Sequence, residues 1–310
     1  MVKTQKIEFK NFSWINITNP DEKTMNQIRE EYDFHPLDIA DCLSMSHRSK
    51  VDAYPTYTFV VLLFPIYDRK TREIKAAELD MFIGDRFLIT VENGNFDIFS
   101  AFFNRFKLSS HIREEYSDKS PEKLVYKFLS KLFMYVFPMV DHITGDCDKI
   151  EETIFSGKEK KMISEILIIR RNVTDFRKIM QAHKNVLKKM VYALKENSIY
   201  VMKKTDVYFE SLIDYTKEIW DMLENLKERI EALQQTNESQ ISFKLSDIMK
   251  TLTVISVITF PVTLLATVFG MNTLKAMPFV NNPHGFWYVT GIMIVIVVSM
   301  LMIFKKKKWL

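Results

Sequence analysis

The sequence predicts an α+β domain, a mixed sheet covered by helices, that leads into a long stalk helix and two C-terminal transmembrane helices. Strand-like and helix-like segments alternate up to about residue 120, and almost every segment from Pro121 onward has a helical pattern. The apolar excess of the chain is concentrated in its last 62 or so residues. The expected parts are therefore a domain over residues 1–120, a long-helix region over 121–248 and a membrane hairpin over 249–310.

The composition excludes several other classes of protein. The chain has 310 residues, of which 47% are hydrophobic and 26% charged, as in folded globular proteins. Its formal net charge of +4 comes from interleaved basic and acidic residues, so no nucleic-acid partner is expected. Cys42 and Cys147 form no CxxC pair, and the first 30 residues contain no apolar signal segment. We expect a reducing compartment, without a disulfide framework or a secretory signal.

Four segments of the N-terminal domain favour β-strands, because they are rich in β-branched and aromatic residues. They are Phe12–Ile17, Tyr57–Ile66, Ala77–Gly84 and Phe87–Asn93. One helix is expected to open at Asn19-Pro20-Asp21 and run to about Tyr32, and a second covers Asn95–Leu108.

The region after residue 120 favours long helices. Pro121 suits a first helical position behind Ser120, and Ser156-Gly157 separates two long helices. A third helix is predicted from about Thr205 into the first apolar run, some 65 residues or roughly 95 Å.

The third helix carries a three-four spacing of apolar residues, which favours packing between copies of the chain. Packing within one subunit is the alternative. The next stretch, residues 234–240, is polar and suits either the lumen of a water-filled funnel or a solvent-facing helix. The spaced apolar residues are Ile219, Met222, Leu226, Ile230 and Leu233.

Two apolar runs, Met249–Phe269 and Phe286–Phe304, are each long enough to cross a bilayer. Lysines lie before the first run and after the second, whereas the connecting loop, residues 270–285, has only Lys275 and His284. The excess of positive charge on the cytoplasmic side of membrane proteins then places both termini in the cytoplasm and the loop outside. The expected location is a cell membrane, with lipid as a partner.

The first span carries a stripe of hydroxyl side chains. At 100° per residue, six side chains fall within an arc of about 80°. Such hydroxyls either bond back to their own helix and pack against neighbours, or line a pore formed by several copies of the chain. The two apolar members at the inner end would then form a hydrophobic constriction that closes by dewetting. The six residues are Met249, Leu252, Ser256, Thr259, Thr263 and Thr267.

Several motifs resemble the CorA family of divalent-cation channels over nearly the whole chain. The most specific is Gly270-Met271-Asn272, which closes the first of two C-terminal spans and resembles the family's GMN signature. The other matching segments are Met277-Pro278 in the loop, "FPVT" at Phe260–Thr263, the tail "KKKKWL" at Lys305–Leu310, and "DFHPLDIADCL" at Asp33–Leu43 followed by "KVDAY" at Lys50–Tyr54.

The resemblance implies a funnel-shaped homopentamer in which five first spans line the pore and five second spans surround them. It also implies that Gly270, Met271 and Asn272 form the selectivity filter. Uncharged amide and carbonyl oxygens suit hydrated Mg²⁺, which releases its waters reluctantly and must not be held too tightly. One departure is Phe279, which stands where many family members carry an acid, so an acidic outer ring is missing.

The resemblance further implies that Mg²⁺ is regulatory as well as transported, because Mg²⁺ bound between cytosolic domains keeps the family's channels closed. In the matching stretch, Val207–Thr216, the candidate ligands are Glu210 and Asp214. The alternative is a pair of solvated surface carboxylates. No organic cofactor is expected.

The leading functional hypothesis is a Mg²⁺ uptake channel that also passes Co²⁺ or Ni²⁺. A relative specialised for another ion such as Zn²⁺ is the second hypothesis, and a non-conducting, membrane-anchored coiled-coil scaffold is the third. The sequence contains no P-loop, HExxH motif or nucleophile elbow, so an enzyme is not expected.

Overall fold

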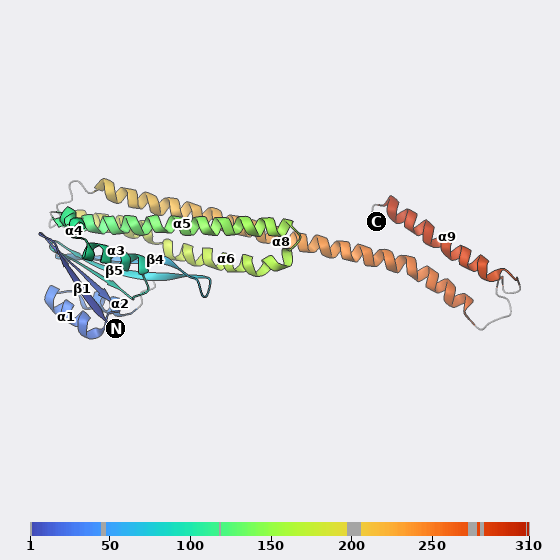
Figure 1. The fold of residues 1–310 in the computed structure, drawn as a ribbon, viewed down its shortest axis with the longest axis horizontal. Helices are drawn as coiled ribbons and strands as arrows, with labels where there is room; N and C mark the ends of the chain where they lie inside the picture. Colours follow the sequence, from blue (N-terminus) through green and yellow to red (C-terminus); the bar gives the residue numbers. More distant parts are fainter. Residues whose placement is uncertain are drawn as a thin grey trace. The chain divides into compact units, whose positions relative to one another are not determined.

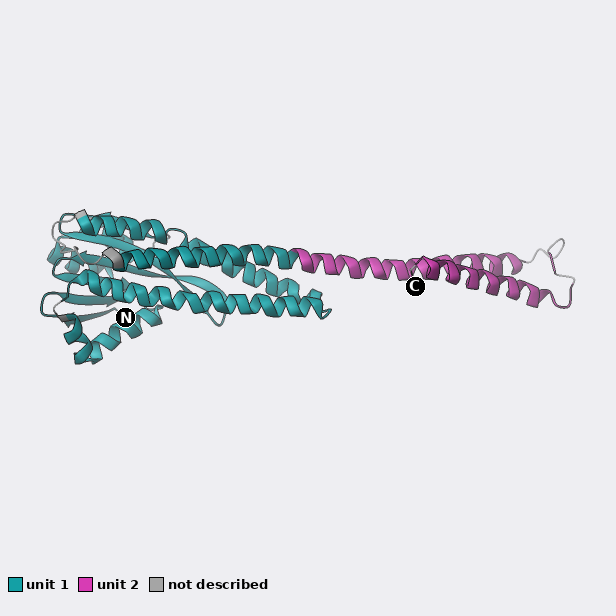
Figure 2. Cartoon of the chain, turned by 90° about the horizontal axis from the view of Figure 1, so that it is seen from above, with its two compact units in different colours: residues 1–234 teal, residues 235–310 magenta. Residues whose placement is uncertain are grey.

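The computed structural model describes residues 2–44, 48–117, 119–196, 206–271, 278–279, 282–307 and 309. These divide into two units, Met1–Gln234 and Gln235–Leu310 (Figure 2). The division falls inside a continuous helix, α8, so each unit is described by itself. The division at residues 120 and 248 that the sequence predicts remains a prediction.

A six-stranded mixed sheet lies in the first unit, with strand order β1-β2-β6-β5-β4-β3 (Figure 1). Strands β2 and β6 pair in parallel, and every other neighbouring pair is antiparallel. The predicted mixed sheet is therefore confirmed. The strands are β1 (Lys3–Glu8), β2 (Ser13–Thr18), β3 (Lys50–Ala53), β4 (Tyr57–Asp68), β5 (Glu73–Gly84) and β6 (Phe87–Glu92).

The four predicted strands correspond to β2, β4, β5 and β6, whereas the two edge strands were missed. Strand β1 is mostly exposed and reads KTQKIE, so it has neither a buried run nor a clear alternation. Strand β3 has only four residues, KVDA, and none of them is buried. Edge strands are commonly short and charged, which removes the apolar signal that identifies a central strand.

Helices α1 (Glu22–Tyr32) and α2 (Pro36–Leu43) cover one face of the sheet. Asp21 caps α1 by accepting a hydrogen bond from the Thr24 amide at 2.8 Å, which confirms the predicted start. Their apolar side chains pack on one face of β2, β4, β5 and β6. The buried members of this cluster include Met25, Ile28, Ile39, Phe59, Phe82 and Ile89.

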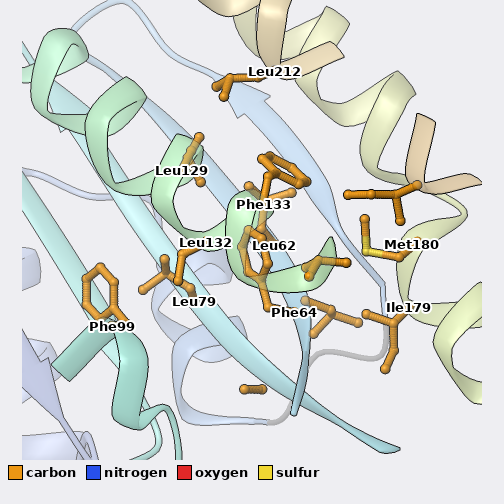
Figure 3. Close-up of a cluster of buried hydrophobic side chains, with 14 of the residues drawn as sticks. Leu62, Phe64, Leu79, Phe99, Leu129, Leu132, Phe133, Ile179, Met180 and Leu212 are labelled. Carbon is orange, nitrogen blue, oxygen red and sulfur yellow. The ribbon is translucent and has the colours of Figure 1, made fainter. Parts of the chain in front are cut away.

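The helices α3, α5, α6, α7 and α8 cover the opposite face. Figure 3 shows part of this core, in which Leu62, Phe64 and Leu79 of the sheet meet Leu129, Leu132 and Phe133 of α5. Ile179, Met180 and Leu212 approach from α6 and α8. The first unit is thus a three-layer arrangement, with short helices on one face of the sheet and long helices on the other. The helices are α3 (Asp97–Leu108), α4 (Ser110–Ser117), α5 (Pro121–Phe155), α6 (Glu159–Met180), α7 (His183–Glu196) and α8 (Asp206–Phe269).

The predicted break at Ser156-Gly157 separates α5 from α6. Gly157 has φ +85°, a left-handed conformation that glycine adopts without a Cβ penalty, and its amide donates to the Ile154 carbonyl at 3.1 Å. A second break, at residues 181–182, separates α6 from α7 and was missed. Those residues are Gln and Ala, which carry no helix-stop signal.

The apolar seam on α8 corrects one expectation. Ile219, Leu226, Ile230 and Leu233 are buried in the core of their own subunit, and Met222 packs against it. Because α5 and α6 already cover this seam, it is not the surface by which copies of the chain associate. The packing-within-one-subunit alternative is therefore the correct one for these residues.

In the second unit, α8 continues to Phe269 and α9 covers Gly285–Lys306. Both helices are long and apolar enough to cross a membrane, and only 6% and 0% of their most apolar stretches is buried inside the chain. An apolar helix that is not buried needs another apolar environment, such as lipid or a neighbouring subunit. The two predicted spans therefore match helices in the structure.

Candidate functional site

The six residues of the stripe lie on α8 and all six are exposed in the single chain. At the inner end, Met249 and Leu252 are 54% and 55% exposed. These fractions are high for large apolar side chains, so the end of the stripe presents apolar surface that the chain itself does not cover.

Three threonines of the stripe bond back to their own helix. The hydroxyls of Thr259 and Thr263 donate to the carbonyls of Ile255 and Thr259, at 2.8 and 3.0 Å. The hydroxyl of Thr267 donates to the carbonyl of Leu264 at 2.9 Å. Such bonds satisfy the hydroxyl hydrogen in an apolar setting and leave the oxygen lone pairs available as acceptors.

The outer end of α8 stops at the predicted motif. The Gly270 amide donates to the Ala266 carbonyl at 2.9 Å, and the Met271 amide donates to the Val268 carbonyl at 3.3 Å. The Met271 side chain is 55% exposed. Asn272, Lys275 and Met277 lie outside the described residues, so the third member of the motif has no described position.

Glu210 and Asp214 lie one turn apart near the start of α8, and both are exposed. Within the described residues, no group of three or more His, Cys, Asp or Glu side chains is arranged to hold a metal ion. A regulatory metal site at Glu210 and Asp214 therefore stays a prediction.

The segment that begins with His35 is a structural cap. His35 precedes α2, and its Nδ1 accepts a hydrogen bond from the Leu37 amide at 3.3 Å. Its ring stacks on Tyr54, with ring centroids 5.7 Å apart. Pro36 occupies the first helical position, where a missing amide hydrogen costs nothing. These contacts give His35 a structural role at the start of α2.

A network of carboxylates and phenols ties α2 to the sheet. The Tyr57 hydroxyl donates to Asp38 at 2.8 Å and accepts from the His35 amide, also at 2.8 Å. Burial raises the pKa of Asp38, although the hydrogen bond from Tyr57 opposes this effect. Burial and then the nearby Asp38 carboxylate raise the pKa of Tyr54 to about 12.

Lys50 is the cation of this network. Its Nζ lies 2.5 Å from Asp41 and 2.6 Å from Asp52, and it is 3.9 Å from Asp38. Burial alone would lower the pKa of Lys50, but the hydrogen bonds to Asp41 and Asp52 raise it, so the ammonium stays charged. Both segments belong to the motifs of the family resemblance, but the ion pairs between them were missed, because only the fold brings α2 and β3 together.

The comparisons with known proteins agree over almost the whole chain. The family described as "CorA-like Mg2+ transporter protein" matches residues 9–306. The chain is 28% identical over 299 residues to the cobalt/magnesium transport protein CorA of Thermotoga maritima, covering 96% of this chain and 83% of that protein.

Two solved structures share its fold. The CorA magnesium transporter of Methanocaldococcus jannaschii superposes with a TM-score of 0.82 at 19% identity, covering 98% of this chain and 94% of that one. The full-length CmaX protein superposes with a TM-score of 0.74 at 16% identity, covering 96% and 89%.

Proposed function

This chain belongs to the CorA family of Mg²⁺ transporter proteins, and from that premise we propose that it is a homopentameric membrane channel for divalent cations, chiefly Mg²⁺. The relative in Thermotoga maritima is named a cobalt/magnesium transport protein, which supports Co²⁺ as a second cargo. The membrane potential supplies about 4.6 kcal/mol per dication per 100 mV, so inward movement requires no enzymatic cycle.

The hydroxyl stripe of α8 is the observation that carries this proposal. Thr259 and Thr263 use their hydroxyl hydrogens within their own helix, at 2.8 and 3.0 Å, so their oxygens face outward as acceptors. Hydrated Mg²⁺ keeps its water shell and presents water hydrogens to its surroundings. A row of neutral acceptors can therefore follow the hydrated ion without binding it as tightly as carboxylates would.

A pore requires several copies of the chain, because two helices cannot enclose water. The stripe residues are exposed in one chain, and α8 and α9 leave their apolar surfaces uncovered. Five α8 helices that turn their stripes toward a common axis would bury apolar surface between neighbouring helices and leave the stripes facing a water-filled pore. Five α9 helices would then form the outer, lipid-facing ring.

We assign selectivity to Gly270, Met271 and Asn272. The helix ends at Phe269, so the backbone turns out of the helix at the start of the motif. Five Asn272 amides and the Gly270 carbonyls would supply uncharged acceptors to the first-shell waters of the ion. Lys275 is the only formally charged residue between Gly270 and Gly285, which agrees with a filter that acts through dipoles.

Closure of the channel is assigned to two other places. Rings of Met249 and Leu252 would form an apolar constriction, which excludes ions when it loses water. Glu210 and Asp214 would bind cytosolic Mg²⁺ together with ligands from a neighbouring subunit and so favour the closed state. Both termini would lie in the cytoplasm, since lysines flank the hairpin on that side.

The two other hypotheses have less support. Zn²⁺ prefers nitrogen and sulfur ligands, but the loop from 270 to 285 contains no cysteine and a single histidine, His284. A non-conducting scaffold has no use for aligned hydroxyls in a span. The seam that would have favoured a coiled coil is buried within its own subunit.

Ion flux into vesicles tests the proposal. The full-length protein is reconstituted with Mg²⁺, Co²⁺ or Zn²⁺ outside, and the wild type is compared with Asn272→Ala. We expect the wild type to pass Mg²⁺ and Co²⁺. The Mg²⁺ flux of Asn272→Ala should be at least tenfold lower than that of the wild type. Asn225→Ala, an exposed asparagine of α8 ahead of the span, is the matched control and should behave as wild type. Equal flux in all three would remove the filter assignment.

A further inference from the structure

The loop between the two spans returns to α9 through a compact turn. The Asn282 amide donates to the Phe279 carbonyl at 3.2 Å, and the Gly285 amide donates to the Asn282 carbonyl at 2.9 Å. The Asn282 side-chain oxygen accepts from the His284 amide at 3.0 Å. Three hydrogen bonds thus fix the described residues that lead into α9.

Gly285 is the centre of this turn. It is buried, and a Cβ at this position would lie 2.2 Å from the Phe279 carbonyl oxygen and 3.1 Å from its carbon. No side chain fits at such distances without moving the backbone, so only glycine permits this approach. The close contact joins the returning loop to the first residue of α9.

Phe279 is held in an unusual conformation at the same place. Its φ is +70°, in the left-handed region that an aromatic residue rarely adopts. Its ring lies near Tyr288 of α9, with centroids 5.8 Å apart. Strain of this kind persists only where the surroundings determine the backbone, here the hydrogen bonds and the Gly285 contact.

The turn also lies beside the end of α8. Phe269 and Gly270 line a cavity of about 490 Å³ together with Phe279, Gly285 and Phe286. The first residue of the assigned filter and the returning loop therefore border the same space.

We propose that the contact between Gly285 and the Phe279 carbonyl positions the selectivity filter. Gly285 is then a positioning residue that touches no ion, and it acts by fixing the returning loop beside the end of α8, where Gly270 begins the assigned filter. This inference rests on the proposed channel function. It adds a determinant of selectivity outside the Gly-Met-Asn motif, on the second span.

The experiment compares two glycine substitutions on the same helix. Gly285→Ala introduces the clash, whereas Gly291→Ala is the matched control, because its added Cβ meets nothing within 4 Å. Both full-length variants are reconstituted into vesicles, and the ratio of Mg²⁺ to Na⁺ flux is measured beside the thermal unfolding midpoint. We expect Gly285→Ala to lower the ratio at least tenfold while its midpoint stays close to that of Gly291→Ala.

A second variant covers the case in which Gly285→Ala does not assemble. Asn282→Ala removes the side-chain acceptor of the turn without adding bulk, and it should lower the same ratio severalfold. If the wild type prefers Mg²⁺ to Na⁺ and the assembled Gly285→Ala and Asn282→Ala variants show the same flux ratio, then this inference is wrong. The proposed function would remain intact. A wild type that passes no divalent cation would overturn both.

Discussion

At the scale of single residues, the positions that matter most carry little sign of it in the sequence. His35 caps α2, and Lys50 binds carboxylates from two different elements. Gly285 is one of seven glycines, and only the distance from its absent Cβ to the Phe279 carbonyl reveals its role. Local motifs predict caps and turns, whereas contacts between distant segments need the fold.

His183, the first residue of α7, is fully buried among apolar side chains. Its ring meets the edges of Phe64 and Phe133, with centroids 5.4 and 5.8 Å away. Burial lowers the pKa of His183 from its ordinary value of 6.5 to about 4, and nearby backbone carbonyls offset only part of this effect. The imidazole is therefore neutral in the folded protein at neutral pH.

This burial predicts a loss of stability in acid. Between pH 6.5 and pH 4 the unfolded chain takes up a proton that folded His183 does not, so the free energy of unfolding falls as the pH falls, by about 3 kcal/mol in total. His183→Phe should remove this contribution. The test is denaturant unfolding at pH 7 and pH 4, followed by circular dichroism. His142→Phe, at an exposed position, is the control, and parallel pH curves for wild type and His183→Phe would contradict the prediction.

At the scale of elements, the sequence predicted the central strands and the long helices better than the edges and breaks. Strand β4 has a nearly continuous apolar run, so its burial is evident from composition, whereas β5 also buries the carboxylates of Glu78 and Asp80. The prediction that the apolar seam on α8 packs between copies of the chain was wrong. A three-four apolar spacing shows that a helix face is covered, but it does not specify whether the covering helix belongs to the same chain. Helix α8 ends at Phe269, as the apolar pattern predicts, whereas the predicted start of the first span at Met249 lies inside α8 and stays a prediction.

If Met249 and Leu252 form a hydrophobic constriction, then a smaller side chain there should let ions through the closed channel. Leu252→Gly removes an apolar side chain from the proposed constriction, so Mg²⁺ flux in the presence of high internal Mg²⁺ should rise several-fold. Leu264→Gly is the matched control, because Leu264 is also 55% exposed on α8 but lies about 120° around the helix. The measurement is flux into vesicles that contain millimolar Mg²⁺. An equal leak in both variants would indicate loss of helix stability instead of loss of a gate.

At the scale of the whole molecule, one chain contains residues for the proposed pore lining, constriction and regulatory site. Each of these sites would need the same residues from neighbouring subunits. The stripe faces outward, Met249 and Leu252 have no partner ring, and the carboxylates of Glu210 and Asp214 do not gather a metal set among the described residues. Assembly around an axis would complete all three at once. The family resemblance predicted a pentamer, whereas the apolar spacing and the hydroxyl stripe alone indicated association of copies without their number.

Cysteine accessibility measures whether the stripe of α8 faces water, as the proposed pore requires. The native cysteines can stay in place, because Cys42 and Cys147 are buried, and burial raises the pKa of Cys42 well above its usual value and that of Cys147 to about 11. Both therefore remain as unreactive thiols at neutral pH.

Single cysteines are introduced by Thr263→Cys, in the stripe, and by Leu265→Cys, about 160° around the same helix. Each reconstituted variant is treated with a charged, membrane-impermeant thiol reagent while Mg²⁺ flux is recorded. The account predicts that the reagent modifies Thr263→Cys and blocks its flux, and that it leaves Leu265→Cys unmodified and conducting. Modification of Leu265→Cys with no modification of Thr263→Cys would contradict the account, because the hydroxyl stripe would then face away from the water path.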